Sequence, residues 1–293
     1  MSRGERAEAR DSTALGKCST IVDSQVHIWP TNPDQSSRPF GHKIWLTERM
    51  LLLRMARAGV DQVVLVSSLS DTTGNRTSSE AARRHPDKFM VMGRLDLRRP
   101  RGVAALAEHL KRNSLVGYRF AFFGRDRSLL VDGSCDWFWS AAERLGLPVM
   151  VFADGMCSHL ARVAERHPGL RLAIDHLNLC PWIRDEDIAP LLAQTLALAR
   201  HPNVSVKASG LPCHVTEQYP YPGLRDHIER VVDHFGPDRT FWGSDLSRLP
   251  CSYEEAVAVF RHHLDFLDPT DLALVMGVGV SRWLGSRTDA IAG

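Results

Sequence analysis

The stretch TIVDSQVHIW, residues 20–29, alternates β-prone apolar residues with polar ones and is followed by a proline. A period of two predicts a strand whose two faces meet different surroundings. Asp23, Gln25 and His27 then point to one side of the strand, and the residues between them point to the other. A polar row inside a core is costly unless it is hydrogen-bonded or functional. A satisfied polar core and a functional site are therefore the two interpretations of this row.

Short β-prone runs of this kind recur along the chain and alternate with amphipathic helical patterns. The predicted strands are Thr20–Trp29, Gln62–Ser67, Phe89–Leu95, Val116–Phe122, Pro148–Phe152, Leu170–His176, Val204–Ala208 and Thr240–Asp245. The predicted helices include Glu48–Ala58, Val103–Lys111, Trp137–Leu145, His159–Arg166, Asp187–Arg200, Leu224–Phe235 and Tyr253–Leu267. Strict alternation of strand and helix demands parallel pairing with right-handed crossovers. Eight such units favour an α/β fold of the closed (β/α)8 type, the TIM barrel, over an open doubly wound sheet.

Length and composition agree with one large globular unit. The chain has 293 residues, of which 44% are hydrophobic and 24% charged, and a barrel of this type needs about 250 residues. We expect residues 18–293 to form a single barrel domain. Residues 1–17 mix basic and acidic residues without the apolar core of a signal peptide, so we expect a disordered tail there.

Charge, hydropathy and cysteine usage exclude several partners. A net charge of +2 argues against a nucleic-acid partner, and no apolar run reaches the length of about 18 residues that a membrane span needs. The six cysteines are scattered and form no Cys-x-x-Cys pair, which favours reduced thiols in a cytoplasmic enzyme. The sequence leaves open whether the chain forms a homodimer.

Three sites far apart in the chain fall where predicted strands end. They are His27 in the first strand, the sequence Ile174-Asp175-His176 in the sixth, and Trp242-Gly243-Ser244-Asp245 in the eighth. In a parallel barrel the carboxyl ends of all strands meet at one rim, where active sites lie. Imidazole, amide and carboxylate groups at that rim suit the polarisation of a carbonyl and the activation of a water.

These motifs, in this order and at these strand ends, resemble the TIM-barrel amidohydrolases, and in particular their lactonase and decarboxylase branch. The resemblance runs from Ile21 to about Leu284 and includes the segments VGYRF, residues 116–120, and VKASG, residues 206–210. In that family the first strand reads Asp-x-His-x-His, strand six ends in a histidine, and strand eight ends in an aspartate. The resemblance implies a hydrolase with its active site at the carboxyl ends of the strands.

The chain departs from the family pattern at the residues that bind metal. Gln25 stands where the first metal-binding histidine is expected, and an amide is a poorer zinc ligand than an imidazole. The fifth strand, which runs into Asp154, lacks a histidine. We therefore expect no cofactor and a metal-independent site. A zinc ion on His27, His176 and Asp245 with one open position stays as the alternative.

Without a metal, Asp245 is the candidate general base, and the residues placed to polarise the substrate carbonyl are Gln25, His27 and His176. Candidate substrate-binding residues are cations and an aromatic ring near other strand ends: Arg119, Lys207, Arg125 and Trp29. Arg125, in the loop after the fourth strand, and Arg248, after the eighth, are equally well interpreted as solvated loop charges. Because arginine matches a carboxylate, the expected partner is a small anionic or polyhydroxylated lactone, from a sugar acid or a carboxylated product of aromatic breakdown.

Other activities remain open at this point. The branch also contains metal-dependent decarboxylases, which the loss of a histidine at Gln25 disfavours. Lactone isomerisation needs only proton transfer in the same cavity. A catalytically inactive binding barrel is the third alternative, although the presence of His27, His176 and Asp245 together argues against it.

Overall fold

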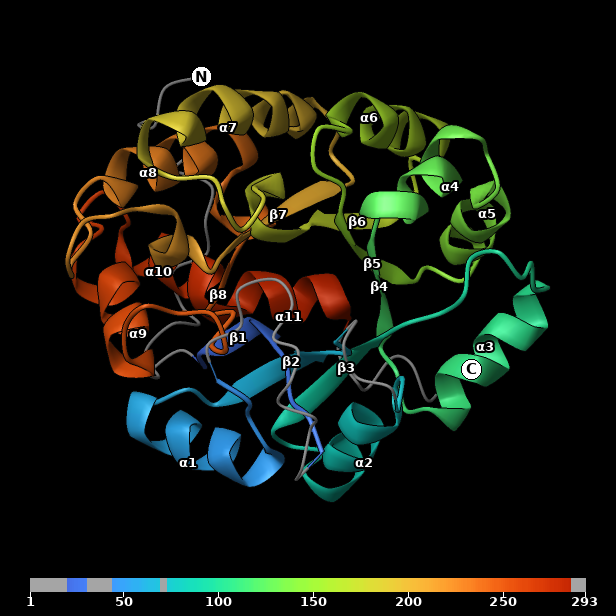
Figure 1. Ribbon diagram of the computed structural model, residues 1–293, viewed down its shortest axis with the longest axis horizontal. Helices are drawn as coiled ribbons and strands as arrows, with labels where there is room; N and C mark the ends of the chain where they lie inside the picture. Colours follow the sequence, from blue (N-terminus) through green and yellow to red (C-terminus); the bar gives the residue numbers. More distant parts are fainter. Residues whose placement is uncertain (1–19, 31–43, 69–72, 286–293) are drawn as a thin grey trace.

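Figure 1 shows the computed structural model of the chain, which describes residues 20–30, 44–68 and 73–285. The expected tail, residues 1–17, lies outside the described residues. Eight parallel strands follow one another around the sheet in sequence order. They are β1 Val22–Val26, β2 Gln62–Val66, β3 Phe89–Gly93, β4 Gly117–Ala121, β5 Pro148–Phe152, β6 Arg171–Ile174, β7 Val204–Ser209 and β8 Thr240–Gly243. The last strand returns to the first, where the backbone N–H of Asp245 donates to the carbonyl of Gln25 at 2.9 Å. The predicted TIM barrel is therefore confirmed.

Helices surround the strands, most of them as an outer layer (Figure 1). They are α1 Glu48–Ala58, α2 Arg76–Arg84, α3 Val103–Arg112, α4 Arg127–Val131, α5 Asp136–Arg144, α6 Cys157–Arg166, α7 Ile188–Leu196, α8 Leu224–Phe235, α9 Tyr253–His262, α10 Pro269–Ala273 and α11 Gly279–Leu284. Helix α2 was not among the predicted helices, because the residues that it buries are serines and alanines, not a stripe of large apolar side chains. Helix α9 ends earlier than predicted, and Asp268 caps a new helix, α10.

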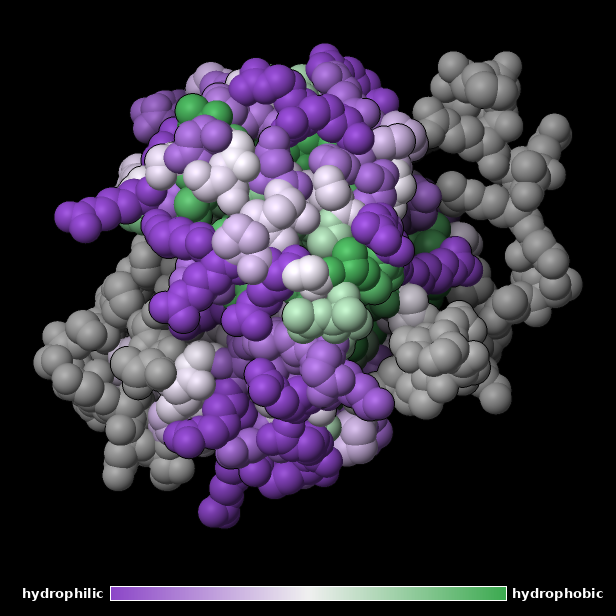
Figure 2. All heavy atoms as spheres, turned by 90° about the vertical axis from the view of Figure 1, so that its right-hand side faces the viewer, coloured by the Kyte–Doolittle hydropathy of each residue, from purple (hydrophilic) through white to green (hydrophobic). Residues whose placement is uncertain are grey.

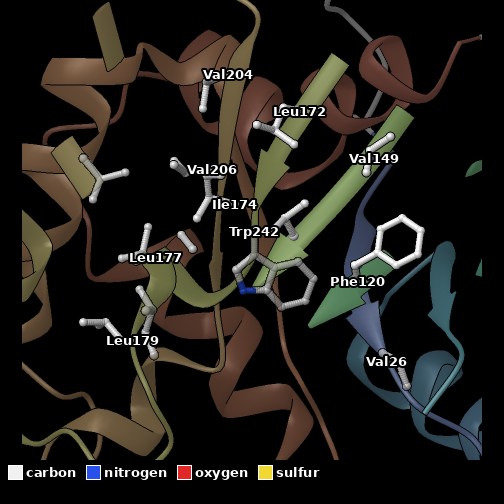
Figure 3. Packing of buried hydrophobic residues seen from close by; sticks show 14 of the residues in the cluster. Val26, Phe120, Val149, Leu172, Ile174, Leu177, Leu179, Val204, Val206 and Trp242 are labelled. Atoms are coloured by element: carbon white, nitrogen blue, oxygen red, sulfur yellow. The ribbon is translucent and has the colours of Figure 1, made fainter. Parts of the chain in front are cut away.

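The apolar residues of the strands fill two separate layers. Inside the barrel, Val22, Val64, Met150 and Phe241 belong to a cluster that is closed by residues of α11, so this helix plugs the amino-terminal end of the barrel. The opposite faces of the strands pack against the surrounding helices, and Figure 3 labels several of these side chains: Val149, Leu172, Ile174, Val204, Val206 and Trp242. The inner cluster thus fills the amino-terminal part of the barrel interior.

On the side that Figure 2 shows, hydrophilic residues dominate and hydrophobic residues form only a small patch. Among the described residues, no helix combines the length and the hydropathy that a membrane crossing requires.

Candidate active site

A cavity opens at the carboxyl ends of the strands, where the sequence places its candidate residues. Its polar lining comes from four strand ends and the turn after β8, and its apolar lining from the last residues of β4 and β5 and from neighbouring loops. The lining residues are His27, Ser68, Arg119, Ala121, Phe123, Phe152, His176, Leu179, Pro181, Asp245 and Arg248. The predicted convergence of His27, His176 and Asp245 is thus present, because all three line this one cavity.

The first strand carries a β-bulge that changes which side chains face inward. Its register against β2 slips between Asp23 and Val26. Val22 lies in the inner cluster, so Asp23 points outward, where its carboxylate accepts from the Tyr253 hydroxyl at 2.6 Å and the Ser244 N–H at 2.9 Å. The prediction that Asp23 shares the inner row is wrong, because a bulge adds one residue and shifts the alternation. Asp23 instead joins β1, β8 and α9.

His27 is oriented by two hydrogen bonds. Its Nδ1 lies 2.7 Å from the carbonyl oxygen of Val66, which can only accept, so this nitrogen carries the proton. The other nitrogen, Nε2, lies 3.3 Å from Nε2 of Gln25 and 3.7 Å from Oδ1 of Asp245. Burial lowers the pKa of His27, against the opposing pull of Asp245. A neutral His27 therefore presents a lone pair at Nε2, and it donates from there only as an imidazolium.

His176 lies in a strained turn directly after β6. Its φ of 53° and that of Leu177, 52°, fall in the left-handed region, which costs energy for residues other than glycine. The turn brings His176 Nδ1 to 2.9 Å from the Ser209 hydroxyl at the end of β7. Burial lowers the pKa of His176 to about 3, so the ring is neutral at pH 7. The strain is consistent with a functional position, since the turn places the imidazole in the cavity.

Asp245 also has a left-handed backbone, with a φ of 48°. Its Oδ2 accepts from Arg248 NH1 at 3.0 Å, three residues further along the same turn. Gly210 lies against it, and a Cβ at that position would stand 3.3 Å from the Asp245 Cβ. The carboxylate is only 1% exposed, so the Arg248 guanidinium supplies charge compensation inside the site.

Below the cavity, three charged residues form a buried ion cluster. Asp175 accepts from Arg119 Nε at 2.8 Å through Oδ2, and its Oδ1 lies 3.0 Å from Lys207 Nζ. The two cations hold the pKa of Asp175 well below its usual range against the effect of burial, whereas burial lowers the pKa of Lys207. With Asp245 and Arg248 included, three cations stand against two carboxylates, so the site carries one excess positive charge when both histidines are neutral. This field favours an anionic ligand.

Of the four predicted substrate-binding residues, one lines the cavity and three do not. Arg119 lines the cavity. Lys207 does not, because it is fully buried beneath it. Trp29 is 2% exposed and packs edge-on against Trp45 at a ring distance of 4.5 Å, outside the cavity lining. Arg125 lies on the exposed surface and is not among the lining residues.

Sequence reasoning gave no role to Asp175 or Ser209, although both contact candidate residues. A signal for Asp175 was present, since two cations in apolar strands require a buried counter-charge. Ser209 had no such signal, because only the turn at His176 brings it into contact. The sequence allows Arg248 to be either a substrate-binding residue or a solvated loop charge. In the structure it lines the cavity.

The fold and the site can now be compared with known proteins. A family model described as Amidohydrolase matches residues 22–277. The chain belongs to this amidohydrolase family. It is 30% identical over 256 residues to an L-fucono-1,5-lactonase from Burkholderia ambifaria. The match covers 78% of this chain and 81% of the relative. The resemblance to the lactonase and decarboxylase branch of this family is therefore confirmed. The prediction that the chain is a hydrolase of the amidohydrolase type is also confirmed.

Solved structures of other amidohydrolases share the fold. A structure from Pseudomonas putida named "Putative 2-Pyrone-4,6-Dicarboxylic Acid Hydrolase" is 22% identical, with a TM-score of 0.75, and covers 92% of this chain and 98% of its own. An amidohydrolase from Burkholderia multivorans with bound zinc is 20% identical, with a TM-score of 0.71, and covers 91% and 99%. Because these structures are less than 25% identical to the chain, their similarity establishes the barrel fold and not the activity.

A zinc ion is bound in one of these solved structures, so the residues of this site have to be considered as metal ligands. Across residues 20–30, 44–68 and 73–285, no three His, Cys, Asp or Glu side chains are grouped as a metal site requires. The amide oxygen of Gln25, its one atom suited to ligate a cation, accepts from the Lys207 ammonium. The Arg248 guanidinium similarly holds one oxygen of Asp245. The donor set therefore fits a divalent cation poorly, because Gln25 and Asp245 already accept hydrogen bonds from protein cations.

Acidification is expected to destabilise this amidohydrolase as the pH falls below about 6.5. Burial lowers the pKa of His176 to about 3 and that of His214 to about 4, so the folded chain keeps both rings neutral where the unfolded chain binds protons. Stability is then lost as the pH falls from 6.5 toward these values, by up to roughly 1.4 kcal/mol per pH unit for each ring. The urea midpoint measured across this range tests the sign.

The matched control is His214→Gln, because His214 donates to the carbonyl of Ile183 at 3.0 Å and does not line the cavity. This variant is expected to take up about one proton fewer on unfolding, which makes the free energy of unfolding less dependent on pH. A urea midpoint that stays constant or rises on acidification would contradict the neutral, buried state of these histidines.

Proposed function

We propose that this amidohydrolase hydrolyses a lactone ring with water activated by Asp245. The observation that carries the proposal is the position of the Asp245 carboxylate, which lines the cavity 3.7 Å from Nε2 of a neutral His27 and 3.0 Å from the Arg248 guanidinium. The Arg119 guanidinium lines the same cavity. This arrangement combines a base with donors for a developing negative charge, which acyl transfer to water requires. The lactonase relative from Burkholderia ambifaria supports the same reaction class.

The proposed reaction proceeds in two balanced steps. Asp245 accepts a proton from water while the water oxygen bonds to the lactone carbonyl carbon, and the carbonyl oxygen becomes an oxyanion. The carbon–oxygen bond of the ring then breaks, and the leaving oxygen takes the proton from Asp245. The product is an open-chain hydroxy acid. Arg119 and Arg248 face the oxyanion as N–H donors, and loss of one such donor typically costs about 100-fold in rate or more.

The histidines and Gln25 support this step in different ways. His176 adds a further donor when the Ser209 hydroxyl donates to its Nδ1, because the ring proton then lies on Nε2. The role expected for His27 changes, since its proton is held at Nδ1 by the carbonyl of Val66. Gln25 does not line the cavity and contacts His27 instead.

The proposed substrate is a small lactone with a carboxylate or several hydroxyl groups. Arg119 and Arg248 offer planar donors that match a carboxylate. The same cavity is lined by Phe152, Leu179 and Pro181, which give a ring an apolar surface for contact. A carboxylated ring uses both kinds of lining, whereas a sugar-acid lactone uses mainly the polar one.

We further propose that the reaction needs no metal ion, because Gln25 and Asp245 already bind Lys207 and Arg248. Treatment with a chelator is expected to leave lactone hydrolysis unchanged within about twofold, since each group in the proposed steps belongs to the protein. Acid release before and after chelation, together with the metal content of the purified protein, measures this. Loss of activity that added zinc restores would contradict the metal-free reaction.

A further inference from the structure

Lys207 contacts three acceptors, which equals the number of protons on its ammonium group. They are Oε1 of Gln25, Oδ1 of Asp175 at 3.0 Å and the sulfur of Met150 at 3.3 Å. The side chain is fully buried and does not line the cavity. Because Lys207 does not line the cavity, its direct contacts are with these protein groups.

The hydrogen bonds that start at Lys207 have a single possible direction. An ammonium only donates, so the atom of Gln25 that it meets is the oxygen, and the amide nitrogen is left for His27. Gln25 Nε2 lies 3.3 Å from His27 Nε2, which accepts. At the far end, His27 Nδ1 lies 2.7 Å from the carbonyl oxygen of Val66, which only accepts. Both ends of the chain of bonds therefore impose the same tautomer on His27, with the proton on Nδ1.

We propose that Lys207 and Gln25 are positioning residues for the base Asp245, and that they act together with the Val66 carbonyl by fixing the tautomer of His27. His27 Nε2 lies 3.7 Å from Asp245 Oδ1. In the opposite tautomer, Nε2 carries a proton and donates it to that oxygen after a small movement of the ring. Such a bond stabilises the carboxylate anion and makes Asp245 a weaker base toward the proton of water. The inference rests on the proposed function for the role of Asp245.

The first test uses no substrate, so it stands apart from the proposed activity. Nitrogen-15 NMR of the histidine rings distinguishes a protonated nitrogen from one with a lone pair, and the signals of His27 are assigned by their loss in His27→Gln. We expect the wild-type protein at neutral pH to carry the proton on Nδ1. Gln25→Met removes the amide and leaves only the Val66 carbonyl to favour the proton on Nδ1. We therefore expect a larger fraction with the proton on Nε2 than in the wild-type protein. A wild-type ring protonated on Nε2 would overturn the inference.

The second test is kinetic and uses the same variant. Gln25→Met is expected to lower kcat by about 10-fold to 100-fold, since small misplacements at a reacting centre have effects of this size. KM is expected to stay within about threefold, because Gln25 does not line the cavity. A merely structural role would lower the amount of folded protein and leave the kcat of the folded fraction unchanged.

Gln62→Met is the matched control for this substitution. Gln62 begins the neighbouring strand β2, and its side chain donates to the carbonyl of Asp87 at 3.1 Å, away from the cavity. We expect this control to keep the wild-type tautomer and kcat. Lys207→Met is expected to shift the tautomer as Gln25→Met does. If Gln25→Met keeps both the wild-type tautomer and the wild-type kcat, the positioning role is wrong. If the wild-type protein opens no lactone, the proposed function fails while the NMR result still decides the tautomer.

Discussion

Replacement of Asp245 by Asn is expected to lower lactone turnover by about 1,000-fold, within the range that a general base contributes. The amide keeps the size of the side chain and still offers an oxygen to Arg248, which now bonds the carboxylate at 3.0 Å. It cannot accept a proton from water at neutral pH. The loss should therefore appear in kcat, with little change in the temperature of unfolding. Single-turnover rates and thermal unfolding of the same preparation measure the two quantities.

The control for this variant is Asp154→Asn. Asp154 follows β5 at the same end of the barrel but does not line the cavity. Its neutralisation is expected to change kcat by less than about threefold. Unchanged turnover in Asp245→Asn would remove Asp245 from the reaction, and an equal loss in both variants would indicate a general field effect instead of a specific base.

Replacement of Asp175 by Asn is expected to give the largest loss of stability, about 3–5 kcal/mol. Asp175 is fully buried and is the shared counter-charge of Arg119 and Lys207, at 2.8 Å and 3.0 Å. An amide leaves two buried cations without the negative charge that offsets their desolvation. The free energy of unfolding from urea titration is the measurement.

Asp136→Asn provides the comparison, because Asp136 pairs with Arg166 at 3.0 Å on the surface, where their side chains are 42% and 55% exposed. An exposed pair of this kind contributes at most about 1 kcal/mol. If both substitutions lower the free energy of unfolding by the same amount, the buried cluster stabilises the fold no more than an exposed ion pair does.

The fold could be predicted from the sequence because its signals are local and repeat along the chain. Each of the eight strands falls within or close to its predicted range, and the order of the motifs set their places around the barrel. Helix α2 escaped prediction because it buries small residues. The outward position of Asp23 was equally hidden, since a bulge in β1 leaves no mark in the alternation of residue types.

The site could be predicted only in part. His27, His176 and Asp245 follow strands, and the topology of the barrel brings them to one cavity. The placement of Lys207 beneath the cavity could not be foreseen, because a charged residue on an inner strand face can equally meet a substrate or a buried counter-ion. Arg125 and Trp29 depend on the paths of loops, which residue types do not determine.

The central claim is that this amidohydrolase adds water to a lactone ring. The most direct measurement follows acid release by purified protein from a panel of sugar-acid lactones and carboxylated aromatic-derived lactones, with products analysed by mass spectrometry. The account predicts acid release after chelation and a product heavier than its substrate by one water. Loss of carbon dioxide, an isomer of unchanged mass, or no product from any lactone of the panel would contradict it.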